Sequence, residues 1–428
     1  MAEGGTASRR AAAELLYTVV EKRRTLDDAV SNVDTYSELE GADRGFARAM
    51  ASAALRDLGR INLALQPLLD RPLEAASPPI RSLLQIGAAQ IWLLGTPVHA
   101  AVGETVEAAK QWPMARRGSG FLNAVLRKLP DVKTSFDDLP PDAIWPDWFR
   151  HALLAQFDKD TVERLAEAQR AVPAVHLTSK GGDGSALAAR VDGTWLTGPS
   201  IALSSADIPS VPGYAEGEWW VQDAAAALPA SLLQVSGGDT VVDLCAAPGG
   251  KTLQLASTGA NVFAVDRSKT RLKRVEENLA RTGLSQAVSL VASKGEEWTP
   301  PTPVDAVLVD APCSALGTLR RHPEGPWIKR PNEIAGYPDI QKRLLTAGLD
   351  MLKPGGDLVY CVCSPLAQEG IDVLASVLSN GGVSRRAIEA SEVPGFEACI
   401  TEQGDLVTLP GTTFAHDAFY VGRLQKHA

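Results

Sequence analysis

The chain has 428 residues, of which 45% are hydrophobic and 22% are charged, a composition typical of a soluble globular protein with two or three domains. Its formal net charge of -9 argues against a protein that coats nucleic acid without specificity, because Lys and Arg drive phosphate binding. The start of the sequence mixes apolar with charged residues and indicates no secretory signal, and no stretch reaches the roughly 18 apolar residues of a membrane span.

The five cysteines form neither an even set nor a C-x-x-C pair, so they predict no disulfide framework and no structural zinc. Free cysteines are typical of a reducing compartment. We therefore expect a cytoplasmic protein that needs no metal and has no membrane partner.

Across residues 9–128, apolar residues recur at helical spacing, and no alternating strand pattern is visible. This pattern predicts an all-α domain over residues 1–135. Residues 136–218 open with a helical pattern over residues 148–172 and then become rich in Gly and Ser. They predict a small α+β linker domain.

From Trp219 onward, strand and helix patterns alternate, which predicts a mostly parallel sheet with helices on both faces. The predicted strands cover residues 240–244, 261–266, 288–292, 304–310 and 356–363. The predicted helices begin at Lys251 and cover residues 269–282 and 340–352. The expected fold of residues 219–428 is therefore α/β, with ligands at the carboxyl ends of the strands.

A turn of small residues, Cys245 to Thr252, joins the first of these strands to its helix. Small residues let a ligand approach the backbone, and the start of a helix offers free N–H groups. A Walker loop would need Gly where Cys245 stands, and the dinucleotide pattern G-x-G-x-x-G is absent. The remaining candidate ligand is S-adenosylmethionine. Asp266 ends the next strand, where a carboxylate can accept both ribose hydroxyls, although a helix N-cap is the alternative interpretation.

Two further strands end in cysteines, Cys313 and Cys363. A lone cysteine is more often a small buried hydrophobe than a nucleophile. A thiolate paired with a second thiol, however, suits covalent addition to a pyrimidine ring. The ends of neighbouring parallel strands meet at one edge of a sheet, so the two sulfurs are expected side by side.

Together these segments resemble the RNA (cytosine-5)-methyltransferases of the Nol1/Nop2/Sun group. The resemblance is carried by residues 243–252, Asp266, residues 310–314 and residues 360–364. The amino-terminal helices resemble the NusB-like RNA-binding domain of the Sun/Fmu branch, with the likeness carried by residues 97–110 and 120–127. The resemblance implies a Rossmann-like, S-adenosylmethionine-dependent methyltransferase domain behind a NusB-like domain. It implies methylation of C5 of a cytosine in 16S ribosomal RNA.

Carried over by position, the resemblance makes Cys363 the nucleophile and Cys313 the thiol that helps to release the product. Asp310 would line both the cofactor and the cytosine, and Lys251 is a candidate for the positive charge near the nucleophile. The implied cofactor contacts are Cys245, Ala246, Ala247, Pro248, Gly249, Gly250, Lys251, Asp266, Ser293 and Asp310. Ser293 stands where the family usually has an acidic residue.

Other positions also depart from the family pattern. Cys361 and Val362 replace the usual Ser-Thr, Gly370 stands where Asn is common, and His176 lies in a region that often shows Arg. Strand alternation predicts that the Cys361 side chain points as Cys363 does. Cys361 is therefore either an inert substitute for Ser or a competing sulfur.

A cluster of charged residues follows Cys313, and Arg320, Arg321 and His322 are the preferred RNA contacts, with a solvated face as the alternative. The expected partner is 16S rRNA or a small-subunit assembly intermediate, and the expected form is a monomer. Two alternative functions stay open: a non-catalytic RNA-binding or ribosome-assembly factor, and cytosine-5 methylation of tRNA.

Overall fold

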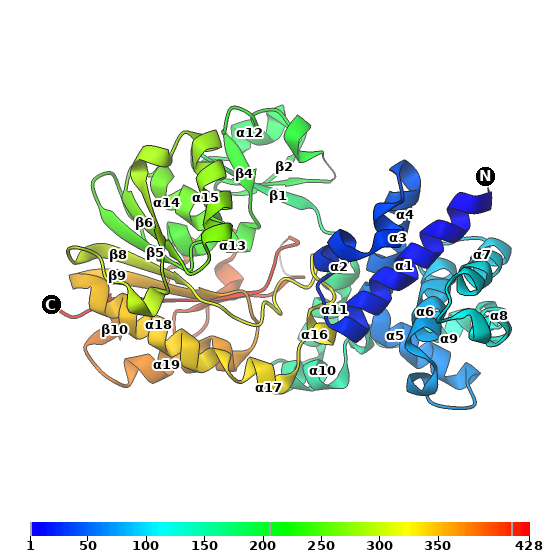
Figure 1. Ribbon diagram of the computed structural model, residues 1–428. Helices are drawn as coiled ribbons and strands as arrows, with labels where there is room; N and C mark the ends of the chain where they lie inside the picture. The colour runs from blue at the N-terminus through cyan, green and yellow to red at the C-terminus, as the bar shows by residue number, and fades with distance from the viewer. Residues whose placement is uncertain (1, 205–206, 412–413) are drawn as a thin grey trace. The chain divides into compact units, whose positions relative to one another are not determined.

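The computed structural model describes residues 2–204, 207–411 and 414–428 (Figure 1). The chain forms two compact units: residues 1–171 with 319–331, and residues 172–318 with 332–428. The first unit includes residues 136–171, which the sequence-based boundaries assign to the linker domain; those boundaries stay a prediction. None of the helices in the described part of the chain is long and apolar enough to span a membrane.

The first unit is helical, as predicted. Its longer helices pack around α1, whose buried side chains include Leu15, Leu16 and Val19, and the main neighbours of α1 are α4, α6 and α7. The helices of this unit are α1 (Ala2–Lys22), α2 (Leu26–Asn32), α3 (Asp34–Ser37), α4 (Gly41–Arg56), α5 (Leu58–Leu65), α6 (Pro78–Trp92), α7 (Val98–Gln111), α8 (Ser119–Leu126), α9 (Lys133–Asp137), α10 (Asp147–Leu154), α11 (Lys159–Arg170) and α16 (Gly325–Ile328). The single helical pattern expected over residues 148–172 is two helices, because Asp158 caps α11 by accepting from the Thr161 N–H at 2.7 Å.

A short segment of the carboxyl-terminal half, residues 319–331, belongs to the helical unit. Trp327 and Ile328 pack against the helical core. The Glu324 carboxylate accepts a hydrogen bond from the Leu26 N–H at 3.1 Å, and the Arg23 side chain donates to the Ile328 carbonyl at 2.9 Å. This insertion was not predicted, because no local pattern shows that a segment pairs with residues some 300 positions earlier.

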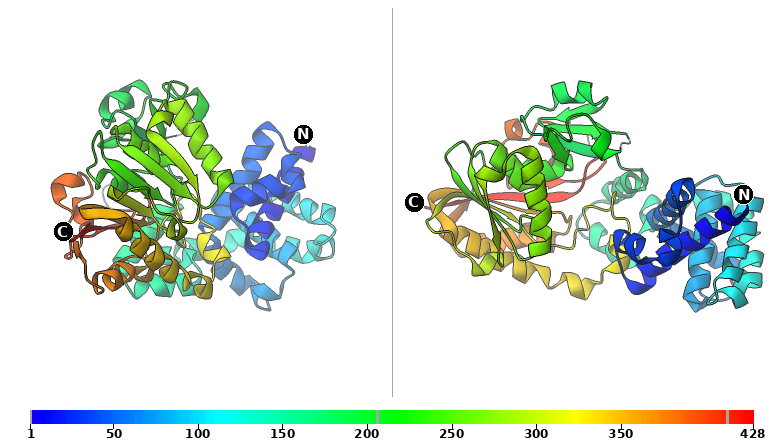
Figure 2. Two further views of the ribbon diagram at one scale, coloured as in Figure 1. Left: turned by 60° about the vertical axis from the view of Figure 1, so that its left-hand side comes forward. Right: turned by 45° about the horizontal axis from the view of Figure 1, so that its top comes forward.

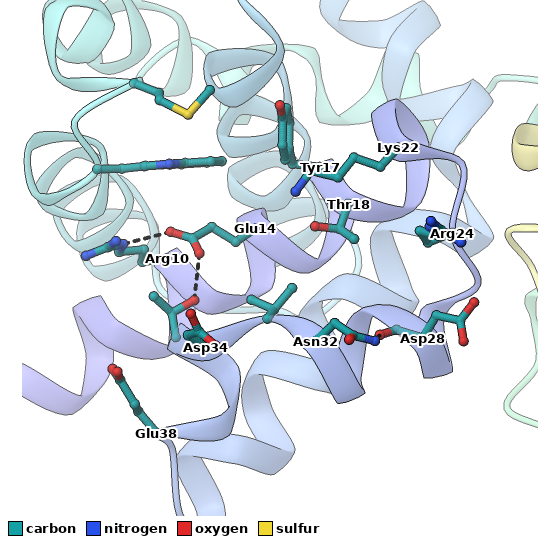
Figure 3. Close-up of a pocket in the computed structure, with 14 residues that line it drawn as sticks. Arg10, Glu14, Tyr17, Thr18, Lys22, Arg24, Asp28, Asn32, Asp34 and Glu38 are labelled. Carbon is teal, nitrogen blue, oxygen red and sulfur yellow. Dashed lines mark hydrogen bonds and ion pairs between the residues drawn. The ribbon is translucent and has the colours of Figure 1, made fainter.

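The helical unit also has an open cavity of about 880 Å³ beside α1, α2 and α3 (Figure 3). Within it Glu14 binds Arg10 at 2.9 Å and accepts from the Thr35 hydroxyl at 2.8 Å. The other charged lining residues mix both signs: Lys22, Arg24, Asp28, Asp34 and Glu38. Because cations and carboxylates balance there, the cavity presents no single sign of charge to a ligand.

The second unit contains two sheets. The smaller has the strand order β2-β3-β1-β4, with all pairs antiparallel. Its elements are β1 (Val175–Ser179), α12 (Ser185–Arg190), β2 (Thr194–Thr197), β3 (Ser200–Leu203) and β4 (Trp219–Val221). Trp219 is fully buried in the core of this sheet with Leu177 and Ile201, so residues 219–221 join the smaller sheet and do not start the α/β fold.

The larger sheet has the strand order β10-β12-β9-β8-β5-β6-β7, with β11 paired to β12. The strands from β9 to β7 are parallel, and β10, β11 and β12 add antiparallel pairs at the other side. The strands are β5 (Thr240–Leu244), β6 (Asn261–Asp266), β7 (Val288–Ala292), β8 (Val304–Asp310), β9 (Leu352–Val362), β10 (Val383–Arg385), β11 (Leu406–Thr408) and β12 (Phe419–Lys426). The chain order reverses between β5 and β8, which is where ligands bind in doubly wound sheets.

Helices cover both faces of the larger sheet (Figures 1 and 2). Apolar residues of α13 and α14 pack on one face, where α15 also lies, and those of α18 and α19 pack on the other. These helices are α13 (Ala224–Ser231), α14 (Gly250–Ser257), α15 (Lys269–Thr282), α18 (Tyr337–Met351) and α19 (Ile371–Leu378), and α17 (Pro331–Ile334) begins where the chain returns to this unit. The predicted α/β fold with a Rossmann-like arrangement is confirmed.

Candidate active site

The turn between β5 and α14 requires small residues. Cys245 has a φ of 65° and Gly249 a φ of 106°, both in the left-handed region that favours glycine. A Cβ at Gly249 would come within 3.0 Å of the Val275 side chain, and one at Gly250 within 3.3 Å of Gln222. Because α14 begins at Gly250, the turn carries backbone N–H groups that no carbonyl of the helix can satisfy. This turn suits a ligand that approaches the backbone closely.

Asp266 ends β6 beside this turn and is 2% exposed. Its carboxylate accepts from the Ala247 N–H at 3.2 Å and from the Ser268 N–H at 2.8 Å, and it lies 3.3 Å from the Arg271 guanidinium. The N-cap of α15 is Ser268, whose hydroxyl accepts from the Arg271 N–H, so the interpretation of Asp266 as an N-cap is wrong. A carboxylate has about four acceptor positions, which leaves capacity for a ribose hydroxyl.

Lys251 and Thr252 have partners within the protein, unlike the same residues of a phosphate-binding loop. The Thr252 hydroxyl donates to Asp243 at 2.6 Å, and the Lys251 ammonium donates to Asp310 at 2.8 Å. Burial raises the pKa of Asp243 to about 7, although the hydrogen bond from Thr252 opposes this. The Lys and Thr of this Gly-Lys-Thr sequence therefore bind carboxylates inside the site, in agreement with the poor match to a Walker loop.

Lys251 places a positive charge beside the acidic and sulfur groups of the site. Its ammonium lies 5.4 Å from the centre of the Phe419 ring, on β12. Burial acts to lower the pKa of Lys251, but the Asp310 carboxylate and the neighbouring Cys361 and Cys363 outweigh burial and raise it. Lys251 is therefore charged at neutral pH.

The Cys313 and Cys363 sulfurs lie 3.4 Å apart. Their strands, β8 and β9, are parallel neighbours that pair Asp310 with Cys361 near their carboxyl ends, so the residues that follow reach the same edge. The contact with Cys363, together with burial, raises the pKa of Cys313 well above the usual range of a thiol. Cys313 thus keeps its proton at neutral pH, and either sulfur can be the donor of this contact. The expectation that the two sulfurs are side by side is confirmed.

Glu369 is a further residue of the site, which sequence reasoning missed. Its buried carboxylate accepts from the Ser314 N–H at 2.7 Å, from the Ser314 hydroxyl, and from the Ser364 hydroxyl at 2.6 Å. Ser314 and Ser364 directly follow Cys313 and Cys363. The single carboxylate therefore ties together the two segments that carry the sulfurs. The spacing of a Glu six residues after a cysteine does not predict this role.

Arg320 does not fit its predicted role as an RNA contact. It is 3% exposed, because its segment folds into the helical unit. Arg321 and His322 are exposed, and the His322 ring lies 3.7 Å from the Glu324 carboxylate. Of the three predicted RNA contacts, only Arg321 and His322 therefore remain candidates.

The positions that depart from the family pattern have local explanations. His176 is buried, and its ring accepts from the Ala224 N–H at 3.2 Å and lies 3.3 Å from the Asp223 carboxylate, so it is a packed interior residue. A Cβ at Gly370 would come within 2.6 Å of the Tyr420 ring, which excludes a larger residue in this arrangement. The Ser293 N–H donates to the Asp266 carbonyl at 3.1 Å, which brings Ser293 to the cofactor side of the sheet.

The profile of the 16S rRNA methyltransferase RsmB/F family matches residues 230–425, and that of the NusB family matches residues 6–131. Ribosomal RNA small subunit methyltransferase B of Pseudomonas syringae pv. tomato is 33% identical over 451 residues, covering 98% of this chain and 97% of its own. The chain belongs to the RsmB/F family of 16S rRNA methyltransferases. The methyltransferase B of Vibrio vulnificus is 31% identical over 438 residues, with 98% and 99% covered.

Solved structures share the fold of this family member. A methyltransferase homolog protein from Pyrococcus horikoshii superposes with a TM-score of 0.55 at 24% identity, covering 66% of this chain and 95% of its own. A further crystal structure covers 98% of this chain and 99% of its own, with a TM-score of 0.75 at 19% identity. The protein is thus a small-subunit rRNA methyltransferase that uses S-adenosylmethionine, and the β5–α14 turn and Asp266 fit that cofactor.

Proposed function

We propose that this RsmB/F family member methylates C5 of a cytosine in 16S rRNA through a covalent adduct with Cys363. The 3.4 Å contact between the Cys313 and Cys363 sulfurs is the observation that carries the proposal. Two thiols in contact, one of which keeps its proton, match a reaction that needs one sulfur to attack and a second group to help release the product. A non-catalytic RNA-binding factor would have no use for this pair beside a buried cation.

The cofactor contacts are assigned to the turn and strand ends described above: Cys245, Ala246, Ala247, Pro248, Gly249, Gly250, Lys251, Asp266, Ser293 and Asp310. When bound, S-adenosylmethionine supplies an electrophilic methyl group. The backbone of the turn and the Asp266 carboxylate bind and orient the cofactor.

Cytosine C5 is a weak nucleophile, because the aromatic ring delocalises its electrons. The Cys363 thiol loses its proton to water, its sulfur bonds to C6, and the ring electrons move toward N3, which makes C5 enamine-like and able to accept a methyl group. Two groups favour the thiolate: the Cys313 S–H, which donates to it, and the Lys251 ammonium nearby. The Asp310 carboxylate accepts a hydrogen bond from the amino group of the ring, and the Lys251 ammonium bound to it offsets the negative charge that develops there.

Product release needs the C5 proton to leave before the bond between Cys363 and C6 can break. A water that the Cys313 thiol orients, or Cys313 itself once its own proton has passed to solvent, accepts this proton. The electron pair of the C–H bond restores the ring, the Cys363 sulfur departs as a thiolate, and it regains a proton from solvent. The sulfur of Cys313 is in contact with that of Cys363 and so lies close to the ring that is bonded there. The reaction then returns both sulfurs to their starting state.

The substrate must present the target base unstacked, since a ring in a helix cannot receive a sulfur at C6. Arg321 and His322 are the proposed RNA contacts near Cys313 in sequence, and the NusB-like helices are proposed to bind the same rRNA as part of a monomeric enzyme. The direct test is transfer of labelled methyl to 16S rRNA that lacks the modification, followed by mapping of 5-methylcytosine. Labelling of tRNA in place of rRNA, or of no RNA despite binding, would refute the proposal.

Two variants separate the roles of the sulfurs. Cys363→Ala should abolish methyl transfer and trap no RNA, whereas Cys313→Ala should accumulate a covalent protein–RNA adduct on a denaturing gel. Cys399→Ala, at a buried cysteine of another segment, is the control and should methylate as the unchanged protein does. An adduct with Cys363→Ala and none with Cys313→Ala would mean that Cys313 attacks the ring and Cys363 helps to release the product.

A further inference from the structure

The Asp310 carboxylate has a donor on each of its oxygens. The Lys251 ammonium donates to Oδ2 at 2.8 Å, and the Cys361 thiol donates to Oδ1 at 3.4 Å. The second contact follows from the fold, because Asp310 and Cys361 are partners in the parallel register of β8 and β9. Two donors on opposite oxygens fix the plane of the carboxylate, which a single donor leaves free to turn about the Cβ–Cγ bond.

Cys361 is suited to donate and not to attack. It is fully buried, whereas Cys313 and Cys363 are partly exposed at the same edge. Burial, followed by the nearby Asp310 carboxylate, raises the pKa of Cys361 well above the usual range of a thiol, so it remains S–H at neutral pH. A protonated thiol is a weak nucleophile and a weak hydrogen-bond donor.

We propose that Cys361 is a positioning residue, whose thiol holds the Asp310 carboxylate in the orientation that binds the edge of the cytosine ring. The inference rests on the proposed function, because it assigns Asp310 to that ring. It replaces both interpretations that strand alternation leaves open, since Cys361 is then neither inert nor a competing nucleophile. Cys363 is then the single attacking sulfur of the three at this edge.

The position should accept a hydroxyl better than a methyl group, because an alcohol can make the same donation. Cys361→Ser should therefore keep kcat within about 2-fold of the unchanged protein, whereas Cys361→Ala should lower kcat by roughly 5- to 10-fold, as expected for loss of a weak bond to a charged group. KM for rRNA should change by less than about 2-fold in both, since neither substitution touches the bulk of the RNA interface.

The experiment measures kcat and KM for 16S rRNA with the full-length Ser and Ala variants, with Cys399→Ala as the control at a buried cysteine elsewhere. Thermal unfolding of each variant checks that it folds. Equal losses of kcat in Cys361→Ser and Cys361→Ala, with both folded, would overturn the positioning role. So would a Cys313→Ala/Cys361→Ser double variant that accumulates no RNA adduct, because Cys361 would then be the nucleophile.

A spectroscopic readout covers the case in which the Ala variant does not fold. The infrared S–H stretch of the full-length protein should contain a hydrogen-bonded component that disappears in Cys361→Ser and shifts to the free-thiol frequency in Asp310→Ala, which has no acceptor oxygen in its side chain. An unchanged component in Asp310→Ala would refute the contact. If the proposed function itself is wrong, the result is distinguishable, because Cys363→Ala would then still methylate rRNA at an unchanged rate.

Discussion

The carboxylate of Glu369 accepts two hydrogen bonds from Ser314, one from the N–H at 2.7 Å and one from the hydroxyl. It also accepts from Ser364, so each residue that follows a sulfur of the pair is bound to one buried group. It fixes the backbone on which the 3.4 Å contact between Cys313 and Cys363 depends.

Glu369→Gln should therefore reduce catalysis more than substrate binding. An amide offers one acceptor oxygen and turns an NH₂ group toward donors, so at least one hydrogen bond of Ser314 or Ser364 is lost. We expect a loss of about 1–3 kcal/mol in the free energy of unfolding and a fall in kcat of roughly 10- to 100-fold, with KM for rRNA nearly unchanged. The measurements are urea unfolding and steady-state methyl transfer.

Asp372→Asn is the matched control, because it makes the same kind of change at an exposed position of α19 and should alter neither quantity. A Glu369→Gln protein that is less stable but has an unchanged kcat would make Glu369 a purely structural residue.

Much of the active-site side of the fold could be predicted because its signals are local. The strands Thr240–Leu244, Asn261–Asp266, Val288–Ala292 and Val304–Asp310 have the bounds that the sequence predicts. Each is a short apolar run rich in Val that is bounded by polar or turn residues, which is a strong local pattern. Because Asp266, Cys313 and Cys363 stand at or just after strand ends, their approximate positions followed from the strands.

The features that were missed depend on partners far apart in the sequence. Glu369 binds Ser314 from 55 positions away, and Glu324 binds Leu26 from 298 positions away. The local sequence around such a carboxylate does not differ from that around a solvent-exposed one, so the sequence predicts a surface charge. The same reason explains why the sequence predicts Arg320 as an RNA contact although this residue is buried.

The short distance between the two sulfurs predicts sensitivity to oxidation. Hydrogen peroxide should convert the Cys313 and Cys363 thiols to a disulfide, with two molecules of water formed for each bond, because the sulfurs need to close only from 3.4 Å to about 2.05 Å. The product lacks the attacking sulfur and should not methylate rRNA. Mass spectrometry should show the loss of two hydrogens and a linked peptide pair, and dithiothreitol should restore activity.

Cys361→Ser is the control for this oxidation, since Cys361 is buried and its thiol is engaged with Asp310. This variant should form the disulfide as the unchanged protein does, and Cys313→Ser should not. A linkage that joins Cys361 to Cys363 would show that the sulfur arrangement differs from the one described.

Lys251→Met should remove the cation of the site and keep most of the packing of the side chain. The Asp310 carboxylate then has no ammonium at 2.8 Å, and the Cys363 thiolate loses a positive neighbour. We expect a fall in kcat of about 100-fold or more, since removal of one preorganised charged donor from an active site typically costs that much. Lys269→Met, at an exposed position of α15, should leave kcat unchanged. An active Lys251→Met enzyme would exclude Lys251 from the chemistry.

Asp243 should make stability depend on pH. Burial raises its pKa in the folded protein to about 7 from its ordinary value of 3.8, so between these values the folded state binds more protons at this residue than the unfolded state does. Stability must then fall as the pH rises through this window and level off above about pH 7. Asp243→Asn removes this dependence, and its neutral amide can still accept from the Thr252 hydroxyl.

The variant should therefore gain stability relative to the unchanged protein as the pH increases. From pH 5 to pH 8 the relative gain should be about 2–3 kcal/mol, because one pKa unit corresponds to about 1.36 kcal/mol and part of the cost is already present at pH 5. Urea unfolding of both proteins at the two pH values measures this change. A constant difference between the two proteins across the pH range would mean that Asp243 ionises in the folded state as easily as in the unfolded chain.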